Sequence, residues 1–173
     1  MSVPGHENVV LVGFMGSGKS SVGRLTAHTL HGRFVDTDRL VVERTGRDIP
    51  QIFAEEGEAF FREQESAVLR SLLGFRRHVV ATGGGIVTVA ENISLLKDLG
   101  LVVWLTASEE IIWDRVSRNR NRPLLHTENP RATIRLLLER RNPLYENVAH
   151  LKIDTTDLTH EQVARLICER FWG

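Results

Sequence analysis

The string with the most specific chemistry covers residues 13–21 and reads GFMGSGKSS. It fits the pattern G-x-x-x-x-G-K-[ST], in which glycines let the backbone fold closely around phosphate and direct N–H groups at it. Lys19 would bridge the β- and γ-phosphates of a nucleoside triphosphate, and the Ser20 hydroxyl would hold Mg²⁺. The Ser21 hydroxyl can donate to the α-phosphate. The string follows an apolar run and opens a helical pattern, which is the context that a phosphate-binding loop requires.

A phosphate loop alone does not distinguish a kinase from a GTPase or a motor ATPase. The guanine-reading string Asn-Lys-x-Asp is absent from the sequence. The third and fourth apolar runs, at 78–81 and 101–106, do not end in the Asp expected of a Walker B strand. These two absences favour a small kinase.

Two carboxylates that could serve the acceptor of such a reaction, Asp36 and Asp38, stand at the end of the second apolar run. Asp36 can bind Mg²⁺ through water, and Asp38 can accept a hydroxyl proton or orient that hydroxyl. A solvated turn is the alternative interpretation of this Asp-Thr-Asp string. The neighbouring phosphate loop favours the catalytic interpretation.

Two further strings could hold a small acceptor. Glu58, Arg62 and Glu65 fall on one face of a predicted helix, where a surface ladder of ion pairs is the structural alternative. Residues 82–85 read TGGG and follow the third apolar run. Consecutive glycines expose backbone N–H groups at the carboxyl end of a strand, where a ligand can approach, although a plain loop is the alternative.

Arginines gather late in the sequence. They are Arg115, Arg118, Arg120, Arg122, Arg131, Arg135, Arg140 and Arg141. The stretch 117–129 is polar and contains Pro123, so we expect a mobile loop. In a P-loop protein such a loop suggests a lid that closes over ATP and supplies charge to the transferring phosphoryl. The alternatives are a solvated loop and, for Arg141, a favourable cap at the C-terminus of a helix.

The pattern of elements explains how these strings could meet. Apolar runs predict strands at 9–12, 33–36, 78–81, 101–106 and 150–153. Amphipathic stretches predict helices near 18–31, 57–74, 108–117, 130–140 and 159–172. Strands alternating with helices predict an α/β sandwich, with a five-stranded parallel sheet covered on both faces. Ligands in such sheets bind beyond the carboxyl ends of the strands, where the strings above begin.

Composition limits the class of protein. At 173 residues and 19.5 kDa the chain has the length of one domain. Lys+Arg and Asp+Glu both number 22, which argues against nucleic acid as a partner. Cys168 is the single cysteine, so a disulfide framework is excluded, and the seven histidines have no metal spacing. With no membrane-length apolar run and no signal-peptide pattern in residues 1–8, we expect a cytoplasmic protein without a membrane partner.

Together the strings resemble the shikimate kinase family, P-loop enzymes of aromatic amino-acid biosynthesis. The similarity runs from Val9 to about Leu158 and includes GFMGSGKSSVGR, DTD, FAEEGEAFFREQE, TGGG, NRPLL and RRNPLY in order. The resemblance implies transfer of the γ-phosphoryl of ATP to the 3-hydroxyl of shikimate, giving shikimate 3-phosphate and ADP. It implies a fold similar to nucleoside monophosphate kinases, with strand order 2-3-1-4-5. Another small-molecule kinase, for gluconate or a nucleotide, is the alternative.

The resemblance also implies roles for single residues. ATP would contact Gly16, Ser17, Gly18, Lys19, Ser20, Ser21, Arg115 and Arg122, with Arg115 against adenine. Shikimate would contact Asp38, Arg62, Gly84 and Arg141, and Mg²⁺ would lie at Ser20 and Asp36. The catalytic residues would be Lys19, Asp38 and Arg122. Residues 1–173 would form one monomeric kinase domain, with a lid at about 115–128 and a shikimate-binding region at about 36–65.

Two departures from the family pattern affect the nucleotide site. Ser21 stands where the family often has Thr, a change that keeps the hydroxyl. Some members carry arginine in the adenine loop after the last strand, where this chain has Asp154-Thr155-Thr156-Asp157-Leu158. We therefore expect backbone contacts to adenine there. A catalytically inactive module would be expected to lack Lys19, Asp38 or the lid arginine, and the sequence retains all three.

Overall fold

A parallel sheet organises the protein, whose computed structural model describes residues 6–119 and 122–173. Within these residues five strands pair in the order β2-β3-β1-β4-β5, as the sequence predicts. The strands are β1 Val9–Val12, β2 Arg33–Asp36, β3 His78–Ala81, β4 Leu101–Thr106 and β5 Leu151–Asp154. The first four match the predicted ranges, and β5 is shifted by one residue. The predicted fold class is therefore confirmed.

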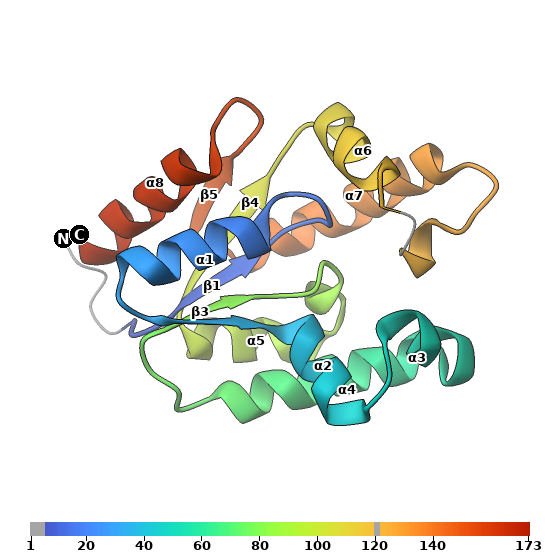
Figure 1. The fold of residues 1–173 in the computed structure, drawn as a ribbon, viewed down its shortest axis with the longest axis horizontal. Helices are drawn as coiled ribbons and strands as arrows, with labels where there is room; N and C mark the ends of the chain where they lie inside the picture. Colours follow the sequence, from blue (N-terminus) through green and yellow to red (C-terminus); the bar gives the residue numbers. More distant parts are fainter. Residues whose placement is uncertain (1–5, 120–121) are drawn as a thin grey trace.

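Helices cover both faces of this sheet (Figure 1). In the described residues they are α1 Lys19–Thr29, α2 Thr37–Thr45, α3 Ile49–Glu55, α4 Gly57–Leu72, α5 Ala90–Leu99, α6 Glu109–Ser117, α7 Pro130–Val148 and α8 His160–Trp172, with short 3₁₀ helices η1 Ile86–Thr88 and η2 Pro123–Leu125.

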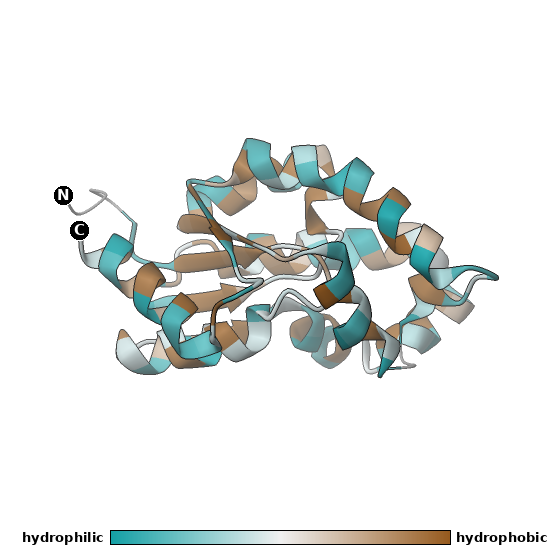
Figure 2. Ribbon diagram, turned by 90° about the horizontal axis from the view of Figure 1, so that it is seen from above, coloured by the Kyte–Doolittle hydropathy of each residue, from teal (hydrophilic) through white to brown (hydrophobic). Residues whose placement is uncertain are grey.

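The central strand β1 shows why apolar residues occupy every position of these strands. Val9 and Leu11 pack with α1 and α8, whereas Val10 and Val12 belong to the core beneath α4, α5 and α7. Successive side chains of a strand point to opposite faces, so a strand buried on both faces is apolar throughout. Figure 2 shows the brown strands enclosed by helices whose outer surfaces are largely teal.

The helices of the structure differ from those that the sequence predicts. α2, α3 and α5 were not predicted, and α7 extends beyond the predicted 130–140 to Val148, with Pro143 inside it. Proline costs the helix one backbone hydrogen bond. The last turns of α7 bury Tyr145 and Val148 completely, and this burial offsets the cost.

The stretch 117–129, predicted as a loop, includes a short helix in its described residues. It contains η2, and Leu125 packs in a third apolar cluster with Phe14 and Ile134. Arg120 and Asn121 lie outside the described residues. The phosphate-loop end of β1 is thus tied to the lid region by apolar contacts.

Candidate functional site

The loop between β1 and α1 has the backbone of a phosphate-binding loop. Gly16 and Gly18 have φ angles of 77° and 93°, which side chains disfavour, so glycine is required at both positions. Lys19 begins α1 and curls back over the loop. Its Nζ donates to the carbonyl oxygens of Gly13 at 2.7 Å and Phe14 at 2.8 Å. Burial lowers the pKa of Lys19 to about 8, although Asp38 and Asp36 act in the opposite direction.

The serines of this loop have different surroundings. Ser20 Oγ donates to Asp36 Oδ2 at 3.0 Å, which brings together the two residues predicted to serve Mg²⁺. Ser17 is buried, and its hydroxyl has no hydrogen-bond partner among residues 6–119 and 122–173. Ser21 is exposed on the first turn of α1. Hard oxygen ligands such as the hydroxyl and carboxylate of Ser20 and Asp36 suit Mg²⁺.

Asp38 is not in the solvated turn that was the alternative interpretation. It lies in the first turn of α2, whose N-cap is Asp36; Asp36 Oδ1 accepts the Asp38 N–H at 3.0 Å. Burial and the adjacent Asp36 raise the pKa of Asp38, while Lys19 lowers it. In the part of the chain that the structure describes, Asp38 Oδ1 has no hydrogen-bond partner. This acceptor atom is available to a ligand.

The ion-pair ladder on α4 forms, and it runs from the exposed Glu58 to the buried Arg62 and Glu65. Arg62 contacts Glu58 Oε1 at 2.9 Å and Glu65 Oε2 at 2.7 Å. Glu65 is fully buried, and burial raises its pKa to about 7 against the charge of Arg62. The ladder therefore holds the Arg62 guanidinium in the interior, and the surface interpretation applies only to Glu58 at its outer end.

The glycine loop after β3 lies against the acceptor residues. A Cβ added at Gly84 would be 3.5 Å from Arg141 Nη1, and one added at Gly85 would be 2.3 Å from Arg62 Nη2. Tyr145 donates a hydrogen bond to the Gly84 carbonyl oxygen. Arg141 lies mid-helix in α7, seven residues before its end at Val148, so the interpretation of Arg141 as a C-terminal cap is also wrong.

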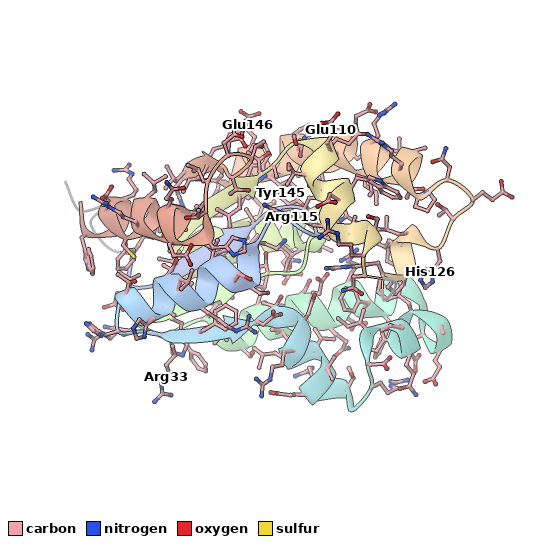
Figure 3. The ribbon with its side chains drawn as sticks, turned by 45° about the horizontal axis from the view of Figure 1, so that its top comes forward. Arg33, Glu110, Arg115, His126, Tyr145 and Glu146 are labelled. Atoms are coloured by element: carbon pink, nitrogen blue, oxygen red, sulfur yellow. The ribbon has the colours of Figure 1, made fainter. Side chains whose placement is uncertain are left out.

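Two further arginines come from α6 and from the segment before η2. Arg115, on α6, reaches the phosphate loop and donates to the Gly16 carbonyl at 2.9 Å (Figure 3). Arg122 precedes η2 and lines both cavities of the site. Its Nε is buried without a partner among the described residues.

All the predicted site residues except Ser17 and Arg115 line a pair of adjoining cavities. One, of about 200 Å³, is formed by the phosphate loop, Ser20 and Asp36. The other, of about 280 Å³, includes Arg62 and Arg141 in its wall. Both cavities are lined by Met15, Asp38, Gly83, Gly84 and Arg122. A donor group in the first cavity would therefore meet an acceptor in the second beside these shared residues.

Some residues of the site were not on the predicted list. Glu65 lines the second cavity, and its place on the Arg62 face of α4 was a signal for it. Tyr145, the only tyrosine in the sequence, lies four residues after Arg141 and so on the same helix face. Thr37, whose Oγ1 accepts the Gly83 N–H at 3.1 Å, gave no signal beyond its place between two aspartates.

The part of the chain that the structure describes has neither a metal-binding cluster nor a membrane-spanning helix. In residues 6–119 and 122–173, no group of three or more His, Cys, Asp or Glu side chains could hold a metal ion. Over the same residues, every helix is too short or too polar to cross a lipid bilayer.

Comparison with known proteins gives consistent results. The family model described as shikimate kinase matches residues 15–172. The shikimate kinase of Thermodesulfovibrio yellowstonii is 45% identical over 165 residues, which cover 95% of each chain. That of Thioalkalivibrio sulfidiphilus is 50% identical over 148 residues, covering 86% of this chain and 78% of the relative.

Solved structures extend the comparison to the fold. The shikimate kinase from Acinetobacter baumannii in complex with shikimate superposes with a TM-score of 0.91, at 43% identity, covering 95% of this chain and 92% of the other. A gluconokinase from Sinorhizobium meliloti reaches a TM-score of 0.65 at 21% identity, covering 99% of this chain and 94% of the other, and shares the fold alone.

Proposed function

This chain belongs to the shikimate kinase family, and from that premise we propose how its residues carry out the reaction. The chain is an ATP-dependent kinase that transfers the γ-phosphoryl of ATP to the 3-hydroxyl of shikimate, giving shikimate 3-phosphate and ADP. The observation that carries the assignment of roles is the pair of cavities with a shared wall, one built from the phosphate loop and one from buried arginines.

The cavity lined by Arg62 and Arg141, here called the acceptor cavity, binds shikimate through positively charged groups and through hydrogen-bonding groups. Arg62 and Arg141 hold the carboxylate, because guanidinium groups bind carboxylates through charge-assisted hydrogen bonds. The backbone of Gly84 and the carboxylate of Asp38 contact ring hydroxyls. Asp38 Oδ1, free of protein partners among the described residues, orients the reacting hydroxyl and takes its proton.

The nucleotide cavity binds the phosphates of ATP through the loop amides and Lys19. Gly16, Ser17 and Gly18 supply backbone N–H groups, and Ser21 supplies a hydroxyl for the α-phosphate. The Lys19 ammonium now donates to two loop carbonyls, and it exchanges these for phosphate oxygens when ATP binds. Its charge stabilises the transferring phosphoryl.

Ser20 and Asp36 are the residues that would hold Mg²⁺. Their 3.0 Å contact gathers a hydroxyl and a carboxylate at the first turn of α1, a donor set that fits this cation. When bound, Mg²⁺ neutralises charge on the β- and γ-phosphates.

The lid at about 115–128 completes the nucleotide side. Arg122 lines both cavities and reaches ATP as the lid closes, adding positive charge in the transition state. Arg115 lies against adenine; its contact with the Gly16 carbonyl already fixes it beside the phosphate loop. Residues 1–173 act as one monomeric domain in the cytoplasm, with the shikimate-binding region at about 36–65.

A coupled assay of ADP release tests the proposed function. The protein is supplied with ATP and Mg²⁺, and with shikimate, gluconate or a nucleoside monophosphate as the acceptor. ADP release that depends on shikimate, and is absent with the other acceptors, is expected. Equal turnover of gluconate would contradict the assignment of Arg62 and Arg141 to a cyclic carboxylate acceptor. Omitting Mg²⁺ should abolish turnover, and it should leave shikimate binding in calorimetry unchanged.

A further inference from the structure

The glycine loop after β3 is held by hydroxyl groups from two distant segments. The Gly83 N–H donates to Thr37 Oγ1 at 3.1 Å, across 46 positions of sequence. The Gly84 carbonyl accepts from the Tyr145 hydroxyl, across 61 positions. Thr37 begins α2 and Tyr145 lies on α7, so the two contacts fix the loop from opposite sides of the site.

The Tyr145 side chain is enclosed at both its ring and its hydroxyl. The side chain is fully buried, and its ring packs at 5.8 Å between centroids on Trp104 of β4. Burial raises the pKa of Tyr145 to about 12, opposed by the charge of Arg141 and by a hydrogen bond between Arg141 and the phenol. The phenol therefore stays protonated at neutral pH and remains a hydrogen-bond donor. Figure 3 shows the labelled Tyr145 inside the molecule, on the inner side of α7.

Thr37 is equally enclosed. Its side chain is fully buried between Asp36, the N-cap of α2, and Asp38. Because Thr37 Oγ1 accepts the Gly83 N–H, that N–H group is already hydrogen-bonded within the protein. The amides of Gly84 and Gly85 have no acceptor among the residues that the structure describes, so these two N–H groups are left for a ligand.

Small movements of this loop would change the geometry of the acceptor cavity. The position of a Gly84 Cβ is 3.3 Å from the Met15 backbone nitrogen and 3.5 Å from Arg141 Nη1. The loop therefore lies between the phosphate loop and the carboxylate-binding arginine. A displaced Gly84 would alter the distance between its amide and Arg141, and effective catalysis depends on such distances.

We propose that Tyr145 and Thr37 are positioning residues for the acceptor, because their buried hydroxyls hold the Gly83–Gly85 backbone at the distance from Arg141 that shikimate requires. This inference rests on the proposed function, in which Gly84 and Arg141 bind shikimate. Neither hydroxyl contacts a substrate; Thr37 acts through the glycine loop, and Tyr145 acts through that loop and through its contact with Arg141. Their removal should affect the acceptor and leave the nucleotide largely untouched.

The Tyr145→Phe variant is the main test, since phenylalanine keeps the ring against Trp104 and removes only the hydroxyl. Steady-state kinetics should give a KM for shikimate raised about 10-fold or more, with the KM for ATP within about twofold of the parent value. The matched control is Thr26→Val, which removes another fully buried hydroxyl that donates to a backbone carbonyl, Val22 O at 2.8 Å in α1. This control should retain both KM values.

Thr37 provides an independent test by the same criterion. Thr37→Val removes the acceptor of the Gly83 N–H and should raise the KM for shikimate, whereas Thr37→Ser keeps a hydroxyl and should restore it. Should Tyr145→Phe not fold, this pair decides the question. Parent-like shikimate kinetics in Tyr145→Phe and Thr37→Val, or equal losses for ATP and shikimate, would overturn the proposal.

Calorimetric titration of shikimate without nucleotide separates this proposal from the proposed function. If the parent protein binds shikimate but releases no ADP, the proposed reaction is wrong, and the change in Kd on Tyr145→Phe still tests the positioning role. A Kd raised about 10-fold supports the role. An unchanged Kd contradicts it.

Discussion

Three buried side chains of the site are shifted toward their neutral forms. Burial lowers the pKa of Lys19 to about 8 and raises that of Glu65 to about 7, and burial also raises the pKa of Asp38. Each shift reflects the loss of water around a charge. A triphosphate beside Lys19 would supply negative charge in place of the water that burial removes. The environment of the Lys19 ammonium therefore improves when nucleotide binds.

The lowered pKa of Lys19 predicts proton uptake when nucleotide binds. At pH 8.5 the amine of the free protein is largely neutral, and the phosphates of ADP should return its pKa toward the usual 10.4 and draw in roughly half to one proton. Calorimetry of ADP binding in buffers of different ionisation enthalpy measures this uptake. In Lys19→Met the uptake should disappear, and an undiminished uptake would assign the proton to another group.

The roles proposed for Asp38 and the arginines predict opposite kinetic effects. Asp38→Asn keeps a hydrogen-bonding oxygen but cannot accept the hydroxyl proton, so kcat should fall about 100-fold or more while the Kd for shikimate changes little. Arg62→Ala and Arg141→Ala each remove a charge-assisted hydrogen bond, so the Kd should rise about 10- to 100-fold. Titration and steady-state kinetics together provide both constants.

A shikimate analogue without the carboxylate is the control for the two arginines. The parent protein should bind it weakly, and neither Arg62→Ala nor Arg141→Ala should weaken binding much further. If both substitutions weakened the analogue as much as shikimate, these arginines would not be holding the carboxylate.

At the scale of elements, the glycine loop and α4 depend on each other. Gly85 has a φ of −93°, so an alanine would fit the backbone there. Its Cβ, however, would be 2.3 to 2.4 Å from the Arg62 guanidinium, which Glu58 and Glu65 hold in place. We predict that Gly85→Ala displaces Arg62 and raises the KM for shikimate about 10-fold or more. The KM for ATP, measured at saturating shikimate, should stay within twofold, and a parallel rise in both would indicate general misfolding instead.

The sequence predicts the strands better than the helices. Strand β1 reads as an unbroken apolar run because both of its faces are buried, and that pattern is unambiguous. α2 starts directly after β2, with Asp36 ending one and capping the other, so no turn separates them in the sequence. α5 begins after Val89 without a side-chain cap, so its start has no sequence signal.

The chemistry of the site was easier to predict than its supports. Lys19 and Arg62 occur in recognisable strings, and their charges alone suggest a ligand. The contacts of Thr37 and Tyr145 to the glycine loop join residues 46 and 61 positions apart. Such contacts depend on how α2 and α7 pack on the sheet. Local sequence patterns do not predict this packing. The end of α7 could not be predicted locally either. Pro143 predicts that the helix ends before it, but the burial of Tyr145 favours continuation of the helix.

At the scale of the whole molecule, the site lies between two groups of helices beyond the carboxyl ends of the strands. Figure 1 shows α6 and η2 on one side of this region and α2 and α3 on the other. The phosphate-binding loop follows β1, the central strand of the sheet. Because Arg122 precedes η2, closure of the proposed lid would carry this arginine relative to the acceptor helices.

Arg122 should therefore act in turnover more than in acceptor binding. In Arg122→Ala we expect kcat to fall about 100-fold or more, as losses of a transition-state charge contact do, with shikimate affinity in the absence of nucleotide little changed. Equilibrium titration of shikimate without ATP provides the measurement. A large loss of affinity there would move Arg122 from the lid into the acceptor site.

The wall that the two cavities share has a consequence for inhibitors. Asp38, Gly84 and Arg122 line both spaces, so a phosphate-bound group and an acceptor-bound one would lie beside the same residues. One compound that joins a cyclic carboxylate to a nucleotide analogue would therefore need only a short tether past these residues. Short linkers give effective concentrations on the order of millimolar. Two fragments that each bind weakly could therefore combine into a tight inhibitor without any new contact to the protein.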